Sequence, residues 1–448
     1  MAHLEKTFPR TLIPRDTTAA AVTAAQRAAY ARRFTALGDP LADAVVEMFR
    51  RRPPGEGRAM FEQALARGID AIADPPHELT VFFQEAETPY WADAEQLDLA
   101  ARVIGRTGPV GLAALSMGAL LGGYLAHRVT KPLIITGDLE RMAARRIAET
   151  THWFVQVTRP CGLEPFAPGW TATLRVRLMH ALVRAGMSRR PDWNWEAWDH
   201  PVNQSQMAGT TTLFALAILS GSEALGLRFS TQEKAAVYHH WRMVGHLLGV
   251  DPQILPTNER DAARLMSLQA GYEFGTPDAD GQQLARALLQ AIGPLTIGDG
   301  DDLPHRIGRT AASALLCAYA RHILGGENSD FLALPDNQLM QRILAGAATV
   351  IGGAEILRRV LPGATRLSEE YGRRSWTAVA ERMMQQHNGN ARYDRHDRIA
   401  AETPRPRSRT DAMTQRPTTK QRYSPPIPTR DVDSATRTVT HARDHQSC

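Results

Sequence analysis

Apolar residues recur along this chain at the spacing of amphipathic helices, and no stretch of any length alternates between apolar and polar residues as a strand does. Breakers such as the run Pro53-Pro54-Gly55 separate the helical stretches. Asp39 before Pro40 has the form of a helix start, because its carboxylate can cap the first turn and proline fits the first helical position. The pattern predicts an all-α protein.

The expected helices follow from these caps and breakers, and with 448 residues the chain can bury a sizeable core. They cover about residues 17–35 (capped by Thr17 or Thr18), a segment opening at Asp39, and then about 56–72, 138–158, 170–185, 210–225, 231–248 (capped by Ser230 or Thr231 and stopped by Gly249), a segment from Asn258, and 307–324.

The most apolar stretch, residues 108–126, contains no charged residue over 19 positions. Its length alone would let it cross a membrane. Glycines at positions 108, 111, 118, 122 and 123 lower its helix propensity and allow close helix packing, so we expect a buried core helix. A membrane span is the alternative that the sequence leaves open.

Charge separates the chain into two parts. Residues 391–448 hold 12 basic and 7 acidic residues, which accounts for the whole excess of 52 Lys and Arg over 47 Asp and Glu, so residues 1–390 are neutral. A neutral fold gives no electrostatic footprint for nucleic acid, and we expect no such partner. We expect an N-terminal arm (1–16), one all-helical domain (17–370, with its motif core at 138–250) and a disordered basic tail (387–448).

The three cysteines, Cys161, Cys317 and Cys448, form neither a CxxC pair nor a metal-binding pattern, and their odd number favours a reducing compartment. The first 20 residues contain no apolar run of the kind found in secretory signals. We therefore expect a cytoplasmic protein and leave peripheral membrane association open.

Common motifs for nucleotide binding, serine hydrolysis and zinc proteolysis are absent from the sequence. Three histidines, His239, His240 and His246, share one expected helix. His239 and His246 are seven residues apart, which is too far for one metal ion held by a single helix. We interpret these histidines as structural, on the polar face or near the C-terminal end of the helix.

The most informative segment is ATLRVRLMHALVRAG, residues 172–186. On a helix, Arg177, His180 and Arg184 share one face at i, i+3 and i+7. A histidine between two arginines on an otherwise apolar helix suits a neutral imidazole bound to a metal, with cations nearby for an anionic group such as a haem propionate. A partly exposed Arg/His stripe and a catalytic general base are two alternatives with the same spacing.

The preceding expected helix carries a second stripe, formed by Arg146, Glu149, Thr150 and Trp153. If both helices face one cavity, these polar side chains converge opposite His180. The alternative is a solvated charged face with one tryptophan tucked into the fold.

The segment LRVRLMHALVR, followed by a Trp-rich linker and HPVNQSQMAGTTTLFA, resembles the family of haem-dependent oxygenases typified by latex clearing protein (rubber oxygenase) and the fungal MpaB oxygenase. HHWRMVGHLLGV fits the same family, and the resemblance covers about residues 35–360. It implies a globin-like fold with haem b, whose iron is bound by His180. Arg177 and Arg184 match the family's flanking arginines, and Arg146 and Thr150 match its distal-side residues.

The activity implied by the resemblance is that of an oxygenase, of the dioxygenase type, which uses O₂ to oxidise or cleave a double bond in a small apolar, isoprenoid-like substrate. An electron donor is an implied partner. Glu149 would act as a catalytic acid or base beside the bound oxygen, and Thr150 and Arg146 would donate hydrogen bonds or position Glu149.

Two departures separate the chain from the rubber-cleaving members. Those members carry a lysine just before the distal threonine, and this lysine can ligate the iron; Glu149 occupies that position here, so we expect an open or water-bound distal side. The segment from Trp198 to Asn203 lacks the glycine of the W-G-x-P-x-N pattern. Two rival functions stay open: a haem protein that senses or stores a ligand without turnover, and a helical protein without haem that binds lipid in the same cavity.

Overall fold

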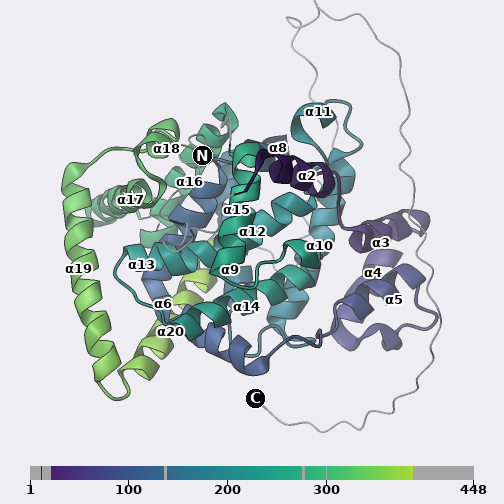
Figure 1. Ribbon diagram of the computed structural model, residues 1–448, viewed down its shortest axis with the longest axis horizontal. Coiled ribbons are helices and arrows are strands. Elements are labelled where there is room, and N and C mark those ends of the chain that lie inside the picture. The colour runs from purple at the N-terminus through teal and green to yellow at the C-terminus, as the bar shows by residue number, and fades with distance from the viewer. Residues whose placement is uncertain (1–11, 13–21, 136–138, 275–277, 299, 387–448) are drawn as a thin grey trace, which may run out of the picture. The chain divides into compact units, whose positions relative to one another are not determined.

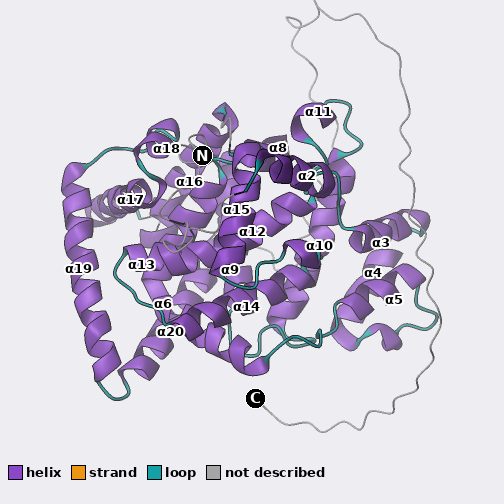
Figure 2. Ribbon diagram, viewed as in Figure 1, coloured by secondary structure: helices purple, strands orange, loops and turns teal. Residues whose placement is uncertain are grey.

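The computed structural model describes residues 12, 22–135, 139–274, 278–298 and 300–386. These residues form helices and loops, and none of them lies in a strand (Figure 2), so the all-α prediction is confirmed. Apart from Leu12, the predicted N-terminal arm lies outside the described residues, as does the predicted tail 387–448. The domain boundaries stay predictions.

The helices follow one another along the chain with short connections (Figure 1). In order they are α2 (Ala24–Phe34), α3 (Pro40–Arg51), α4 (Glu56–Arg67), α5 (His77–Glu85), α6 (Ala94–Ala114), α7 (Leu121–Gly123), α8 (His127–Ile135), α9 (Leu139–Val157), α10 (Pro168–Met187), α11 (Trp195–Trp198), α12 (Gln204–Leu216), α13 (Ser222–Ala224), α14 (Thr231–Leu247), α15 (Glu259–Glu273), α16 (Ala279–Ile297), α17 (Leu303–Leu324), α18 (Gly326–Phe331), α19 (Gln338–Val360) and α20 (Ala364–Gln386).

Capping side chains set several of these starts, as the sequence predicted. Asp39 accepts a hydrogen bond from the backbone N–H of Ala42 at the start of α3, with Pro40 in the first helical position. Of the two candidate caps for α14, Ser230 is the one used, in a reciprocal arrangement with Glu233. The described part of α2 begins later than expected, at Ala24 after Thr23, and the expected caps Thr17 and Thr18 lie outside the described residues.

The apolar stretch lies in α6 and the turns that follow it. Ala94–Gly123 is the single helical stretch, within the part of the chain that the structure describes, whose length and composition would allow it to cross a membrane, and 72% of its apolar window is buried in the fold. This burial agrees with the predicted core helix.

Gly108 has a φ of 48°, and a Cβ on it would lie 3.2 Å from Cα of Gly372. Glycine at this position therefore lets the backbones of α6 and α20 cross in close contact.

Aromatic side chains from helices far apart in the sequence meet in the core. Trp241 of α14 stacks on Phe214 of α12 with 4.9 Å between ring centroids. Phe154 of α9 packs against Trp376 of α20 at the same separation. Contacts of this kind join α9, α12, α14 and α20 around the middle of the fold.

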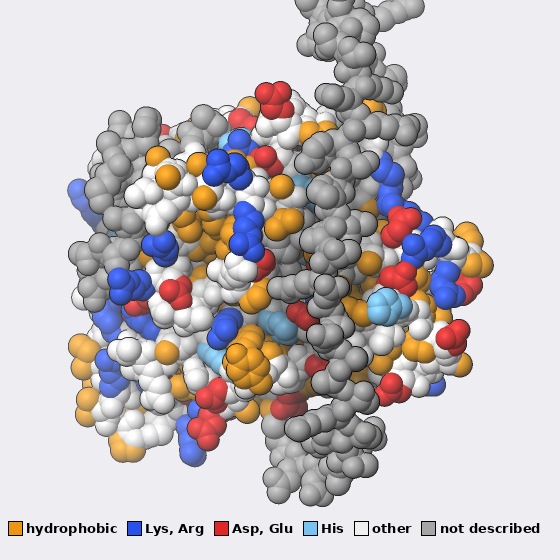
Figure 3. Space-filling model, turned by 45° about the vertical axis from the view of Figure 1, so that its right-hand side comes forward, with side chains coloured by type: hydrophobic (Ala, Val, Ile, Leu, Met, Phe, Trp, Pro, Cys, Tyr) orange, Lys and Arg blue, Asp and Glu red, His pale blue; other side chains and the backbone are white. Residues whose placement is uncertain are grey.

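Charged side chains of both signs are interspersed on the face drawn in Figure 3. No single-sign cluster dominates the described residues on that face. This mixture agrees with the neutral charge balance of residues 1–390.

Candidate functional site

His180 lies near the middle of α10, a 20-residue helix with Pro168 at its first position. Burial lowers the pKa of its imidazole to about 4; Arg184 lowers it further and Asp39 opposes the shift. The ring is therefore neutral at pH 7. Nδ1 is buried and has no hydrogen-bond partner among the described residues.

Arg177, one turn before His180, is held by a carboxylate from the N-terminal part of the chain. Its Nε and Nη2 donate to the two carboxylate oxygens of Asp39 at 2.6 and 3.0 Å. Its guanidinium group also lies over the ring of Phe82, 4.7 Å from the centroid. Arg177 thereby fastens α10 to the first turn of α3, and helices α3, α4 and α5 lie beside α10 in Figure 1.

Arg184, one turn after His180, is held in the same way. Its Nε donates to both carboxylate oxygens of Asp43 at 2.9 and 3.1 Å, and its Nη1 donates to the carbonyl oxygen of Val202 at 2.6 Å. The Arg184 side chain is 2% exposed.

These pairs bear on two interpretations of the arginines. The partly exposed Arg/His stripe is wrong for Arg177 and Arg184, which are each only 2% exposed, although His180 is of intermediate exposure. Asp39 and Asp43 already bind the two arginines. Each arginine also keeps one buried Nη nitrogen without a partner among the described residues, and a role beside an anionic cofactor group stays a prediction.

The HPVNQ segment, residues 200–204, forms hydrogen bonds with the loops that contain Gly38, Gly249 and Asp251. Asn203 caps α12, and Gln204 donates from Nε2 to the carbonyl oxygens of Gly38 and Gly249, both at 2.9 Å. The Oε1 of Gln204 accepts from the backbone N–H of Asp251 at 2.8 Å. Sequence reasoning gave Gln204 no role of its own; its place in a family-like segment was the one signal available.

Helices α9 and α10 form an antiparallel hairpin whose register two contacts set. A Cβ on Gly169 would lie 2.8 Å from Cα of Val157, and Nε1 of Trp153 donates to Oγ1 of Thr173 at 3.1 Å. Arg146 lies seven residues before Trp153 on α9, and His180 lies seven residues after Thr173 on α10. Seven residues are two helical turns, so this antiparallel register predicts that Arg146 and His180 lie level on the same two faces. Glu149 is 2% exposed, which argues against the alternative of a solvated face on α9, whereas Arg146 and Thr150 are of intermediate exposure. The burial of Trp153, at 5%, fits both readings.

Arg146 and Thr150 lie on this side of α9. Burial lowers the pKa of the Arg146 guanidinium, while Tyr124 and Glu149 act in the opposite direction. No hydrogen bond or ion pair joins the side chain of Arg146 or Thr150 to another described residue. Arg146, Thr150 and His180 are each of intermediate exposure, and burial nevertheless lowers the pKa of Arg146 and of His180.

Glu149 differs from its neighbours because it has a strong partner on its own helix. Its Oε1 accepts a hydrogen bond from Nε of Arg145 at 2.7 Å, and both side chains are buried. Sequence reasoning overlooked Arg145, although its spacing of four residues from Glu149 was a usable signal. The catalytic role predicted for Glu149 stays a prediction, but its carboxylate is engaged in this structure.

The histidines of α14 are more deeply buried than expected. His239 accepts a hydrogen bond from the backbone N–H of Asp93 at 3.0 Å and is 9% exposed. His240 is 2% exposed, has no partner at either ring nitrogen within the described residues, and has its pKa lowered by burial to about 3. Their placement on a polar face was therefore wrong. His246 packs edge-on against Trp91.

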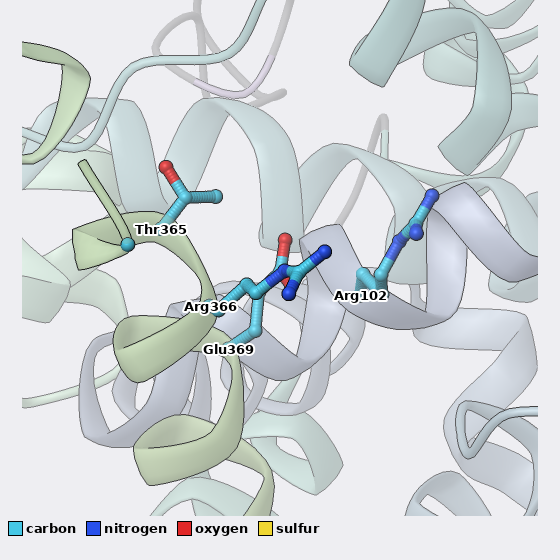
Figure 4. Close-up of a pocket in the computed structure, with 5 residues that line it drawn as sticks. Arg102, Thr365, Arg366 and Glu369 are labelled. Atoms are coloured by element: carbon cyan, nitrogen blue, oxygen red, sulfur yellow. The ribbon is translucent and has the colours of Figure 1, made fainter.

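Two hollows lie away from these residues. One of about 460 Å³ lies between α6 and the start of α20, where Arg102, Arg366 and Glu369 line it (Figure 4). The other, of about 670 Å³, lies among α17, α18 and α19. Neither is lined by a predicted site residue.

Over the described ranges, no group of three or more His, Cys, Asp or Glu side chains is arranged to hold a metal ion. Haem iron, however, needs only one axial side chain from the protein.

Comparison with known proteins adds a family to this geometry. Residues 101–353, more than half of the chain, match the family model described as ER-bound oxygenase mpaB/B'/Rubber oxygenase, catalytic domain. The rubber oxygenase of Streptomyces sp. (strain K30) is 25% identical over 289 residues, which are 64% of this chain and 66% of that protein, just under two thirds of its length. The solved structure of latex clearing protein in its closed state is similar, with a TM-score of 0.55 and 21% identity over 77% of this chain and 89% of that one. At this identity the structural likeness shows the fold alone.

Proposed function

Since the chain belongs to the family of the ER-bound oxygenase mpaB/B' and rubber oxygenase catalytic domains, we propose that it is a haem-b-dependent oxygenase. It uses O₂ to oxidise or cleave a double bond in an apolar, isoprenoid-like substrate, as a dioxygenase does, with an electron donor as partner. The observation that carries the proposal is Nδ1 of His180, which is buried on α10 without a hydrogen-bond partner among the described residues. From the register of α9 and α10 we infer that Arg146 lies level with it.

The residues present fit a haem. A histidine can ligate iron only through an unprotonated nitrogen, and the lowered pKa keeps His180 neutral at pH 7. Nδ1 of His180 has no hydrogen-bond partner in the described part of the protein, so no described group there competes with a metal for this nitrogen. The ion pairs of Arg177 and Arg184 hold the helix turn on each side of His180, which fixes the position of the imidazole.

A bound haem would supply the iron that activates O₂. The chain would contribute hydrogen-bond donors from Arg146 and Thr150 on the face of α9 that looks toward α10. Glu149, bound to Arg145 and electrostatically coupled to Arg146, would balance the buried positive charge and hold or release a proton at its carboxylate. Burial of the site within helices would exclude water from the apolar substrate.

The first test is the visible spectrum of the purified chain. We expect a Soret band, and we expect His180→Ala to lose most of the haem. His239→Ala and His246→Ala are matched controls, since both remove a histidine from α14 and leave α10 unchanged. Full haem occupancy in His180→Ala would refute the assignment of His180.

The second test separates the enzyme from its two rivals. With a reductant present, squalene should increase O₂ uptake, whereas its saturated analogue squalane should not. A Soret band without alkene-dependent O₂ uptake would indicate a haem protein that senses or stores a ligand. A chain that folds without haem and binds both hydrocarbons would indicate a lipid-binding protein.

A further inference from the structure

Helix α19 carries large apolar side chains that no part of the described fold covers. It lies at the edge of the helical fold in Figure 1. The exposed fractions are 63% for Leu339, 47% for Ile343, 73% for Val350, 59% for Leu357 and 73% for Val360. Single exposed apolar residues are ordinary, but a row of them along one helix marks an interaction surface.

The spacing of this row is that of a coiled-coil seam. Together with Gly346 and Gly353, the five residues recur at alternating intervals of four and three, and we call these seven positions the α19 stripe. A Cβ on either glycine would meet nothing within 4 Å. The exposed residues of α19 between Arg342 and Arg359 include no charge.

The opposite face of α19 packs against the rest of its own chain. Leu344 is 7% exposed and joins the hydrophobic core, and Glu355 is buried with its carboxylate bound to Arg358 at 2.6 and 2.8 Å. The packing of Leu344 on the core and the hydrogen bond from Nη1 of Arg358 to Oγ1 of Thr365 at 2.8 Å hold this face of α19 against its own chain. A partner must therefore come to the outer face.

We propose that the α19 stripe is a homodimer interface, in which α19 packs antiparallel against α19 of a second copy of this chain. An antiparallel seam that places Val350 opposite Gly353 of the second copy also places Leu357 opposite Gly346 and Ile343 opposite Val360. Two of these three pairings set a large side chain against a glycine, so each side fills the space that the other leaves. The same patch serves both copies, as a two-fold interface requires.

The exposed area agrees with a stable dimer. The aliphatic side chains of α19 and Leu361 leave on the order of 500 Å² exposed, at about 100 Å² for a fully exposed side chain. A standard interface takes about 800 Å² from each partner, of which somewhat more than half is apolar. The α19 stripe and its neighbours therefore supply the apolar share of one such interface.

A lipid surface is a poorer match than a helix. Helices that lie on membranes carry Lys and Arg along a water-facing side. In α19 the side opposite the stripe packs on the protein, and the uncharged run offers nothing to lipid headgroups. The dimer also brings Arg342 of one copy near Arg359 of the other, so salt should strengthen the association by screening this repulsion.

The test is the mass of the full chain in solution, measured by light scattering and sedimentation equilibrium. We expect a species of twice 49.3 kDa, more strongly associated at 0.5 M than at 0.05 M NaCl. Val350→Glu should raise the dissociation constant at least 100-fold. Gly353→Leu should do the same while keeping the thermal midpoint, because a Cβ at this position meets no atom of its own chain within 4 Å. Tyr90→Glu, at a fully exposed residue between α5 and α6, is the control and should stay dimeric.

Two results would overturn the proposal. One is a chain that stays monomeric at 100 µM. If that monomer also sediments with vesicles of phosphatidylcholine and phosphatidylserine, and Val350→Glu abolishes this binding, the α19 stripe is a lipid contact. The other is a dimer that both folded variants leave unchanged, which would place the interface elsewhere.

Discussion

Arg177 and Asp39 form a buried ion pair between segments 138 residues apart, with two parallel hydrogen bonds of 2.6 and 3.0 Å. Neither side chain is more than 3% exposed. Asp39 also caps α3, so one carboxylate fixes the start of that helix and its attachment to α10. The attachment lies one turn from His180, which makes the N-terminal helices part of the support of the candidate site.

Asp39→Asn should lower the free energy of unfolding by about 3–5 kcal/mol, because it leaves the buried guanidinium of Arg177 without a counter-charge. Asparagine can still cap α3, so the loss reports the ion pair. Asp43→Asn is the comparison: Arg184 is as buried as Arg177, but the Asp43 carboxylate is 37% exposed, so water can partly replace it and we expect a smaller loss. Urea unfolding measures both. Equal losses in the free energy of unfolding would show that the deeper burial of the Asp39 carboxylate does not make its ion pair with Arg177 more stabilising.

Thr173→Val should cost about 1–3 kcal/mol of unfolding free energy, since it removes the acceptor for the buried Nε1 of Trp153. Thr173→Ser keeps the hydroxyl and should lose much less. If the contact also sets the register that brings Arg146 level with His180, the valine variant should hold less haem than the serine variant. Thermal unfolding and the Soret absorbance give the two measurements. Identical behaviour of both variants would count against this register.

Glu149→Gln should destabilise the fold by about 1–3 kcal/mol, because Arg145 then keeps a buried charge with a neutral partner. Any oxygenase rate should fall by about 10²-fold if the carboxylate transfers a proton. The double variant with Arg145→Gln should recover part of the stability and none of the rate. A double-mutant cycle in urea checks the first point and O₂ uptake the second. A double variant that regains full activity would exclude the acid/base role.

Glu273 should make the folded chain less stable as pH rises. Burial raises the pKa of its carboxyl to about 8, with Arg128 opposing and Asp199 reinforcing the shift, and both of its oxygens lack a partner among the described residues. Between about pH 5 and 8 the folded state keeps a proton that the unfolded state loses, so the free energy of unfolding falls over this window by on the order of 4 kcal/mol.

Glu273→Gln tests this prediction, because glutamine is neutral at every pH. The variant should match the parent near pH 5 and exceed its stability above pH 8. Chemical unfolding at pH 5, 6.5 and 8.5 provides the comparison. A constant difference between the two proteins across these pH values would show that Glu273 does not titrate in this window.

Much of the candidate site could be predicted from local spacing. The face shared by Arg177, His180 and Arg184, and the one shared by Arg146 and Thr150, follow from the 3.6-residue period of a helix. The ion pair of Arg145 and Glu149 could also be predicted, because residues four apart are neighbours on a helix. The identity of the partner on the other side could not be read in the same way, because Asp39 and Asp43 are 138 and 141 residues from the arginines they bind.

The sequence by itself determined where most helices lie and how several begin, because caps such as Asp39 and Ser230 act within one turn of the backbone. The tertiary structure alone decided which polar groups are engaged. It paired Arg177 and Arg184 with carboxylates, and it buried Nδ1 of His180 without a partner among the described residues. The reason is physical: helix formation depends on neighbours in sequence, whereas the cost of burying a charge depends on whatever the fold brings next to it.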